Sequence, residues 1–117
     1  MIVRKITRSE RDIELPVIAA VNGIAAGAGA NIALACDVTI AKESAGFLQA
    51  FSKIGLIPDS GGTFTLPRLI GYGRASALMM LGEKASAKDA MERGMIYKAA
   101  ADDEYEAYVE KIAHKLA

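Results

Sequence analysis

The chain has 117 residues, of which 52% are hydrophobic, with 14 basic and 14 acidic side chains and a formal net charge of zero. This length suits one domain, and the apolar share is too high for a disordered segment. A neutral chain lacks the basic footprint of a nucleic-acid-binding protein or of a protein that binds anionic membrane surfaces, so we expect neither partner.

The single cysteine, Cys36, excludes an internal disulfide, and no second cysteine or nearby histidine gives metal-ligand spacing. We therefore expect no metal site and interpret Cys36 as a small buried apolar residue. The N-terminus lacks the apolar stretch of a signal peptide, and the longest apolar tract, residues 24–36, is too short to span a bilayer. These features predict a cytoplasmic protein.

The first half of the chain alternates between helix and strand. Residues 2–14 predict an amphipathic helix that ends before Pro16, and the apolar run 17–21 predicts a strand buried on both faces. Small residues at 27–36 suit a helix that starts close to neighbouring backbone, and 37–41 predict a second strand. A strand, a helix and a second strand imply a parallel connection and an α/β fold.

The second half of the chain is predicted to be mainly helical. Residues 47–57 have ambiguous periodicity, and the break at 58–62 leads into a helix that begins near Thr63. Further helices are predicted at 74–81 and from a capping sequence at 86–89 to a stop at Gly94, followed by a short strand at 96–100. A C-terminal helix then places five apolar residues on one face: Tyr105, Tyr108, Val109, Ile112 and Leu116.

Two short motifs suggest functions that their surroundings disfavour. The turn Gly27-Ala28-Gly29 resembles a dinucleotide-binding motif, but Ile32 stands where that motif needs a small residue, and Gly27 comes four positions after Gly23. Its N–H groups at a helix start would still suit a negatively charged oxygen. The letters Asp-Ser-Gly-Gly at 59–62 match the nucleophile region of trypsin-like proteases, yet the only histidine, His114, lies in a distant polar-faced helix.

Asp59 is the candidate for acid–base chemistry. Pro-Asp-Ser-Gly is ordinary turn chemistry, so a purely structural role stays open. Large apolar residues precede and follow Asp59, and enclosure among them would favour its protonated form, whereas the positive end of the next helix would favour the charged form. The sequence leaves open which effect is larger.

Several stretches occur in unbroken order along nearly the whole chain, namely residues 16–23, 27–29, 34–37, 55–58, 61–63, 66–68, 82–87 and 90–96. Together they resemble the crotonase superfamily, the enoyl-CoA hydratase/isomerase group. The resemblance implies a spiral of ββα units and acyl-CoA thioester substrates. It also implies homotrimers or hexamers, and no permanently bound cofactor, because coenzyme A is part of the substrate.

The resemblance assigns roles to several residues. The N–H of Ala28 forms half of an oxyanion hole, and Asp59 falls where some isomerases of the family carry a catalytic aspartate. The two acid–base glutamates of the hydratases fall on Asn31 and Phe51, neither of which can titrate. The predicted substrate pocket contains four residues: Gly27, Asn31, Phe51 and Ile57.

Residues 52–62 look most like the ring-epoxide isomerase branch of phenylacetate degradation. We therefore expect an acyl-CoA isomerase that uses one aspartate base. The alternatives are an enoyl-CoA hydratase, a dehalogenase or an inactive assembly module. Family members are considerably longer, so residues 1–117 are interpreted as a partial crotonase core, incomplete at both ends. Such a core is expected to lack the second oxyanion donor, to be inactive alone and to expose apolar surface.

Overall fold

The computed structural model describes residues 14–117, so the helix predicted for residues 2–14 lies outside the described part except for its last position. One sheet of three parallel strands contains, in bonding order, β1 (Ile18–Val21), β3 (Val38–Lys42) and β6 (Lys98–Ala100). Ile18 pairs with Val38 across β1 and β3. The predicted parallel connection is thereby confirmed.

A second sheet consists of β2 (Ile24–Ala26), β4 (Gly46–Leu48) and β5 (Lys84–Ser86). β2 and β4 run parallel, whereas β5 pairs antiparallel with β4. Each of these strands has only three residues, which is too short for alternation to show in the sequence. The sequence therefore did not predict them.

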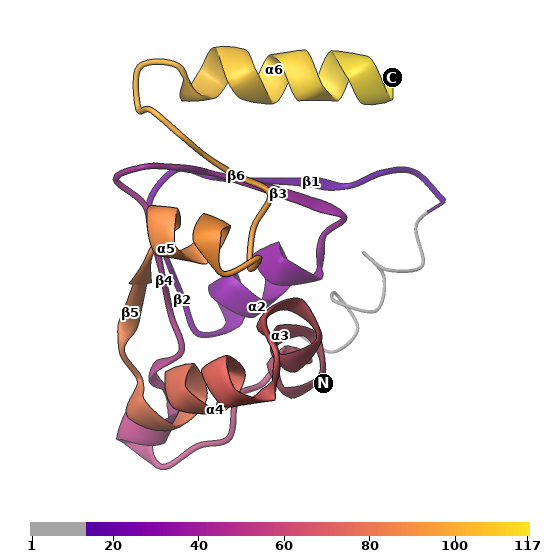
Figure 1. Ribbon diagram of the computed structural model, residues 1–117. Helices are drawn as coiled ribbons and strands as arrows, with labels where there is room; N and C mark the ends of the chain where they lie inside the picture. The colour runs from indigo at the N-terminus through magenta and orange to yellow at the C-terminus, as the bar shows by residue number, and fades with distance from the viewer. Residues whose placement is uncertain (1–13) are drawn as a thin grey trace.

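The two sheets arise from a repeated ββα unit. In the first unit β1 and β2 lead into α2 (Ala28–Ala35), and in the second β3 and β4 lead through η1 (Ala50–Ile54) to α3 (Gly62–Ile70). β3 pairs with β1, and β4 pairs with β2. Each strand of the second unit therefore lies beside the matching strand of the first unit. In Figure 1 the β1–β3–β6 strands run across the molecule and β2 and β4 turn away beneath them. This is the spiral that the resemblance implied.

Three further helices complete the described chain: α4 (Tyr72–Leu81), α5 (Ala87–Glu92) and α6 (Tyr105–Leu116). Gly82 ends α4 with a left-handed φ of 63°, a conformation that glycine adopts at little cost. Ser86 begins α5, where its side chain accepts the Asp89 N–H at 3.1 Å. This hydrogen bond confirms the predicted cap at the start of the helix.

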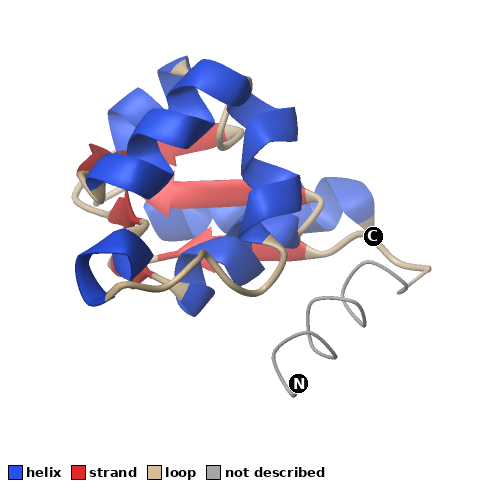
Figure 2. Cartoon of the chain, turned by 90° about the horizontal axis from the view of Figure 1, so that it is seen from below, coloured by secondary structure: helices blue, strands red, loops and turns tan. Residues whose placement is uncertain are grey.

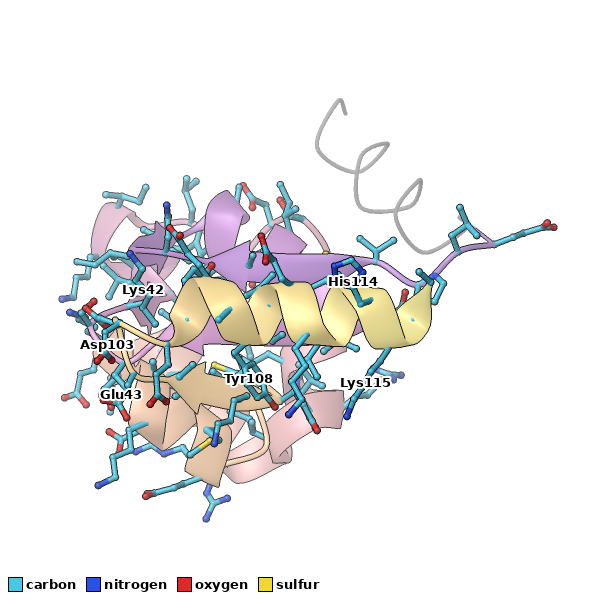
Figure 3. The ribbon with its side chains drawn as sticks, turned by 90° about the horizontal axis from the view of Figure 1, so that it is seen from above. Lys42, Glu43, Asp103, Tyr108, His114 and Lys115 are labelled. Atoms are coloured by element: carbon cyan, nitrogen blue, oxygen red, sulfur yellow. The ribbon has the colours of Figure 1, made fainter. Side chains whose placement is uncertain are left out.

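The core lies on both faces of the β1–β3–β6 sheet. One face packs with α2, α3, α4 and α5, as Figures 1 and 2 show, and Leu66 is 1% exposed there. The other face is covered by α6, which lies over the strands in Figure 3, running along them, and buries Tyr105 against Ile40.

Two predicted burials are wrong. Ala20 is exposed because β1 is an edge strand of its sheet, covered only in part. Cys36 is only half-buried, because it caps the end of α2 and lines a surface hollow there.

Candidate active site

The glycine-rich turn joins β2 directly to the start of α2. Gly27 has φ 56° and ψ −123°, a conformation that residues with a Cβ rarely adopt. Its N–H donates to the Leu48 carbonyl at 2.9 Å, and the Phe51 ring lies 3.5 Å from the place of a Cβ. Ala28 is the first residue of α2, so its N–H has no acceptor within that helix. The turn thus carries a donor suited to a developing negative oxygen.

Asn31 connects this helix start to the Asp59 turn. It is 1% exposed, and its Nδ2 donates to the main-chain oxygen of Asp59 at 2.8 Å. Its Oδ1 accepts a hydrogen bond from Gln49 Nε2. The Asp59 oxygen also accepts the Gly62 N–H at 3.0 Å. Segments 28 residues apart in the sequence are therefore held side by side.

The Asp59 side chain is exposed, and its Oδ1 accepts a hydrogen bond from Ser60 Oγ at 2.8 Å. The predicted enclosure by apolar side chains is wrong for the described chain, because Ile54, Leu56 and Ile57 are 72%, 58% and 80% exposed. Their stretch has no strand or α-helix, and no element among residues 14–117 covers it. The carboxylate consequently lies on an open surface.

The structure brings together three of the four residues predicted to line a substrate pocket. The Gly27 carbonyl accepts the Asn31 N–H at 3.2 Å, and Phe51 is buried against Gly27. Ile57, at 80% exposed, is not enclosed with them. The site in this chain is an open face formed by α2, η1 and the Asp59 turn.

Two residues of this face were missed by sequence reasoning. Gln49 is 3% exposed, and its Oε1 has no hydrogen-bond partner within the described chain. A Cβ on Gly62 would lie 2.4 Å from Asn31 Nδ2, so only glycine leaves room for the asparagine amide. The available signal for Gln49 was a lone amide between Phe47 and Phe51 in a stretch of ambiguous periodicity.

The structure also bears on the protease and dinucleotide motifs. α6 carries His114 and lies on the opposite side of the β1–β3–β6 sheet from α2 (Figures 1 and 3), so no imidazole reaches Ser60. The gap between Gly23 and Gly27 is no argument against a dinucleotide motif, because β2 fills it and the glycine turn follows a strand directly. Ile32 remains unsuited to that motif.

Other possible sites in the described part lie away from this face. A hollow of about 430 Å³ lies between the end of α2 and α3, and another of about 320 Å³ is lined by residues of α4 with Glu83 and Arg93. Among residues 14–117, no three His, Cys, Asp or Glu side chains are grouped to hold a metal ion. Within the same range, every helix is too short or too polar to cross a membrane.

Comparison with known proteins places this face in context. The family model described as enoyl-CoA hydratase/isomerase matches residues 3–117. A probable enoyl-CoA hydratase of Rhodobacter capsulatus is 55% identical over 92 residues, which are 79% of this chain and 36% of that protein. The 1,2-epoxyphenylacetyl-CoA isomerase of Escherichia coli is 52% identical over 102 residues, 87% of this chain and 39% of that protein.

The crystal structure of an enoyl-CoA hydratase from Mycobacterium avium subsp. paratuberculosis superposes with a TM-score of 0.95 at 39% identity. The match covers 97% of this chain and 46% of that structure. The chain thus spans less than half the length of each of these three proteins.

Proposed function

Because the chain belongs to the enoyl-CoA hydratase/isomerase family, we propose that it carries the base and half of the oxyanion hole of an acyl-CoA isomerase. The observation that carries the proposal is the hydrogen bond from Asn31 Nδ2 to the Asp59 main-chain oxygen, 2.8 Å long. This bond holds the main chain of Asp59, whose carboxylate is the one assigned to the site among the described residues, beside the helix that begins at Ala28. The base and the backbone donor therefore come from adjoining segments.

The reaction requires one group that moves a proton and one that holds a negative oxygen. Asp59 takes a proton from the carbon next to the thioester-conjugated system, and the electron pair moves into the thioester to give an enolate. The enolate oxygen accepts the Ala28 N–H, and a donor of this kind contributes about 3–4 kcal/mol to the transition state. The carboxyl group then returns the proton to a different carbon, which shifts the double bond. With a ring-epoxide thioester the same proton transfer would give an enolate, whose electron pair then breaks the adjacent epoxide C–O bond, and the carboxyl group returns its proton to the oxygen that is released.

Two substitutions at the family's acid–base positions favour isomerisation over hydration. Hydration needs one group to activate water and another to handle a proton, yet Asn31 and Phe51 have no titratable side chain. The 52% identity with an isomerase of ring-epoxide thioesters supports the same preference. We propose coenzyme A thioesters as substrates, with coenzyme A as part of the substrate and no further cofactor.

Hydration is the second candidate, because the relative that is 55% identical is named a probable enoyl-CoA hydratase. A dehalogenase and a non-catalytic assembly module are the remaining candidates. In each enzymatic case the open face around Asp59 needs a cover, and we propose that longer chain segments or other subunits of a homotrimer or hexamer provide it. The exposed side chains of Ile54, Leu56 and Ile57 support this need.

The test uses the full-length product of the gene that encodes this chain. It is incubated with 3-enoyl-CoA, 2-enoyl-CoA and ring-epoxide thioesters, and the products are analysed by mass spectrometry. Isomerisation leaves the mass unchanged and moves the unsaturation, whereas hydration of 2-enoyl-CoA adds the mass of one water. Isomerised product without water addition is expected. Water addition without isomerisation would refute the proposal in favour of the hydratase, and no turnover would favour the assembly module.

A further inference from the structure

The main-chain oxygen of Asp59 is held by two donors from different elements. Gly62 N–H, at the start of α3, closes the turn at 3.0 Å. Asn31 Nδ2, from α2, approaches at 2.8 Å. Between them Ser60 and Gly61 both have left-handed φ angles, 55° and 77°. A serine in that conformation is uncommon and needs surrounding contacts to maintain it.

The orientation of the amides in this network follows from chemistry. The Asp59 oxygen can only accept, so Asn31 must direct its NH₂ group toward it. Asn31 Oδ1 then faces Gln49 and requires a donor, so Gln49 must direct its own NH₂ group toward Asn31. The remaining oxygen, Gln49 Oε1, is the buried atom that has no partner among the described residues. The network therefore runs in one direction, from Gln49 through Asn31 to Asp59.

We propose that Asn31 is a positioning residue, which Gln49 orients and which fixes the Asp59 turn through its main-chain oxygen. The inference rests on the proposed role of Asp59 as the base. Asn31 does not touch the carboxylate and does not move a proton in this account. Its amide holds the backbone that carries the carboxylate beside the start of α2. When the thioester oxygen accepts the Ala28 N–H, the reacting carbon of the substrate would then meet the base at a fixed place.

Position 31 requires an amide for this purpose. An ionised aspartate has nearly the same shape but only acceptor atoms, so it would face the Asp59 oxygen without a proton to share. A larger side chain has no room, because Gly62 already lies against the Asn31 amide. Asn31→Asp is therefore the sharpest single change, and Asn22→Asp is its matched control, since Asn22 is exposed at the turn between β1 and β2.

The first arm of the test is independent of activity. In the wild-type protein, NMR should detect a coupling across the hydrogen bond between Asn31 Nδ2 and the Asp59 carbonyl carbon, with slow exchange of one Asn31 side-chain proton. Asn31→Asp should shift the Gly62 amide resonance, and Asn22→Asp should leave it unchanged. A rapidly exchanging Asn31 amide without that coupling would overturn the inference.

The second arm measures kcat and KM for isomerisation. Displacing a catalytic group by about 1 Å costs on the order of 100-fold in rate, so Asn31→Asp should lower kcat about 10- to 100-fold with little change in KM. Gln49→Met, which leaves Asn31 and Asp59 intact, should lower kcat in the same direction by less. Wild-type kcat in both folded variants would overturn the inference. If the wild-type protein has no isomerase activity, the proposed function fails, and the NMR arm alone decides whether Asn31 holds the turn.

Discussion

Replacing Asp59 by asparagine separates proton transfer from the geometry of the turn. Asparagine has nearly the same shape and keeps an oxygen that can accept the hydrogen bond of Ser60 Oγ, which is 2.8 Å long in the native turn. The main-chain oxygen of residue 59 still accepts from Asn31 and Gly62. The variant therefore loses the base and keeps the three hydrogen bonds that define its surroundings.

The expected loss follows from the part that a positioned base plays in the reaction. General acid–base catalysis contributes about 100- to 10,000-fold in rate, which corresponds to about 3–5 kcal/mol of transition-state stabilisation. Since the Ala28 N–H is unaffected, the variant should retain residual activity, with KM close to the wild-type value. The assay measures kcat and KM with 3-enoyl-CoA as substrate at one pH. The kcat of the variant should lie about 100- to 10,000-fold below the wild-type value.

The control is Asp103→Asn, which makes the same chemical change at an exposed aspartate before α6, labelled in Figure 3. It should keep the wild-type kcat and KM. Wild-type isomerase rates for Asp59→Asn would show that another group is the base. A tenfold rise in KM with unchanged kcat would show that Asp59 binds substrate instead.

Three further predictions concern stability. Leu66→Ala removes a core side chain that is 1% exposed and should lower the free energy of unfolding by about 2–5 kcal/mol in urea denaturation. Gly62→Ala should destabilise by about 1–3 kcal/mol, because its Cβ would lie 2.4 Å from Asn31 Nδ2; unchanged stability would mean that the Asn31 amide moves aside easily. Hydrogen bonds from Ser44 lower the pKa of Asp102. The ionised Asp102 therefore stabilises the fold fully above an unfolded-state pKa of about 3.9, and this stabilisation is lost as the pH falls further. Asp102→Asn should remove this part of the acid dependence of the melting temperature.

Most of the fold could be predicted because its elements are long or clearly bounded. The strand at 17–21, the helix that Gly82 ends and the helix that Ser86 begins all carry local signals, and the structure contains them. β2 and β4 could not be predicted, since three residues give no measurable periodicity. The prediction that Ala20 is buried was wrong, because the position of a strand at the edge of a sheet is set by pairing with distant segments and not by the sequence of the strand itself.

The site was predicted in its residues and less well in its environment. Ala28 and Asp59 could be proposed from motifs and resemblance, but the apolar neighbours of Asp59 could not show whether anything covers them. That depends on tertiary contacts, and Ile57 is 80% exposed. Gln49 was missed because a polar residue in an apolar stretch reveals its partner only after folding has brought Asn31 beside it.

The amide at position 31 explains two features of the proposed chemistry at once. The resemblance places a titratable group of the hydratases at this position of α2, so with an amide there Asp59 is the single carboxylate proposed for the described part of the site. The amide also supplies the donor that an ionised carboxylate would lack, and this donor holds the Asp59 oxygen at 2.8 Å. Restoring a carboxylate at position 31 would therefore not convert the site into a two-acid hydratase. It would weaken the hold on the existing base, so we expect such a variant to lose isomerisation without gaining hydration.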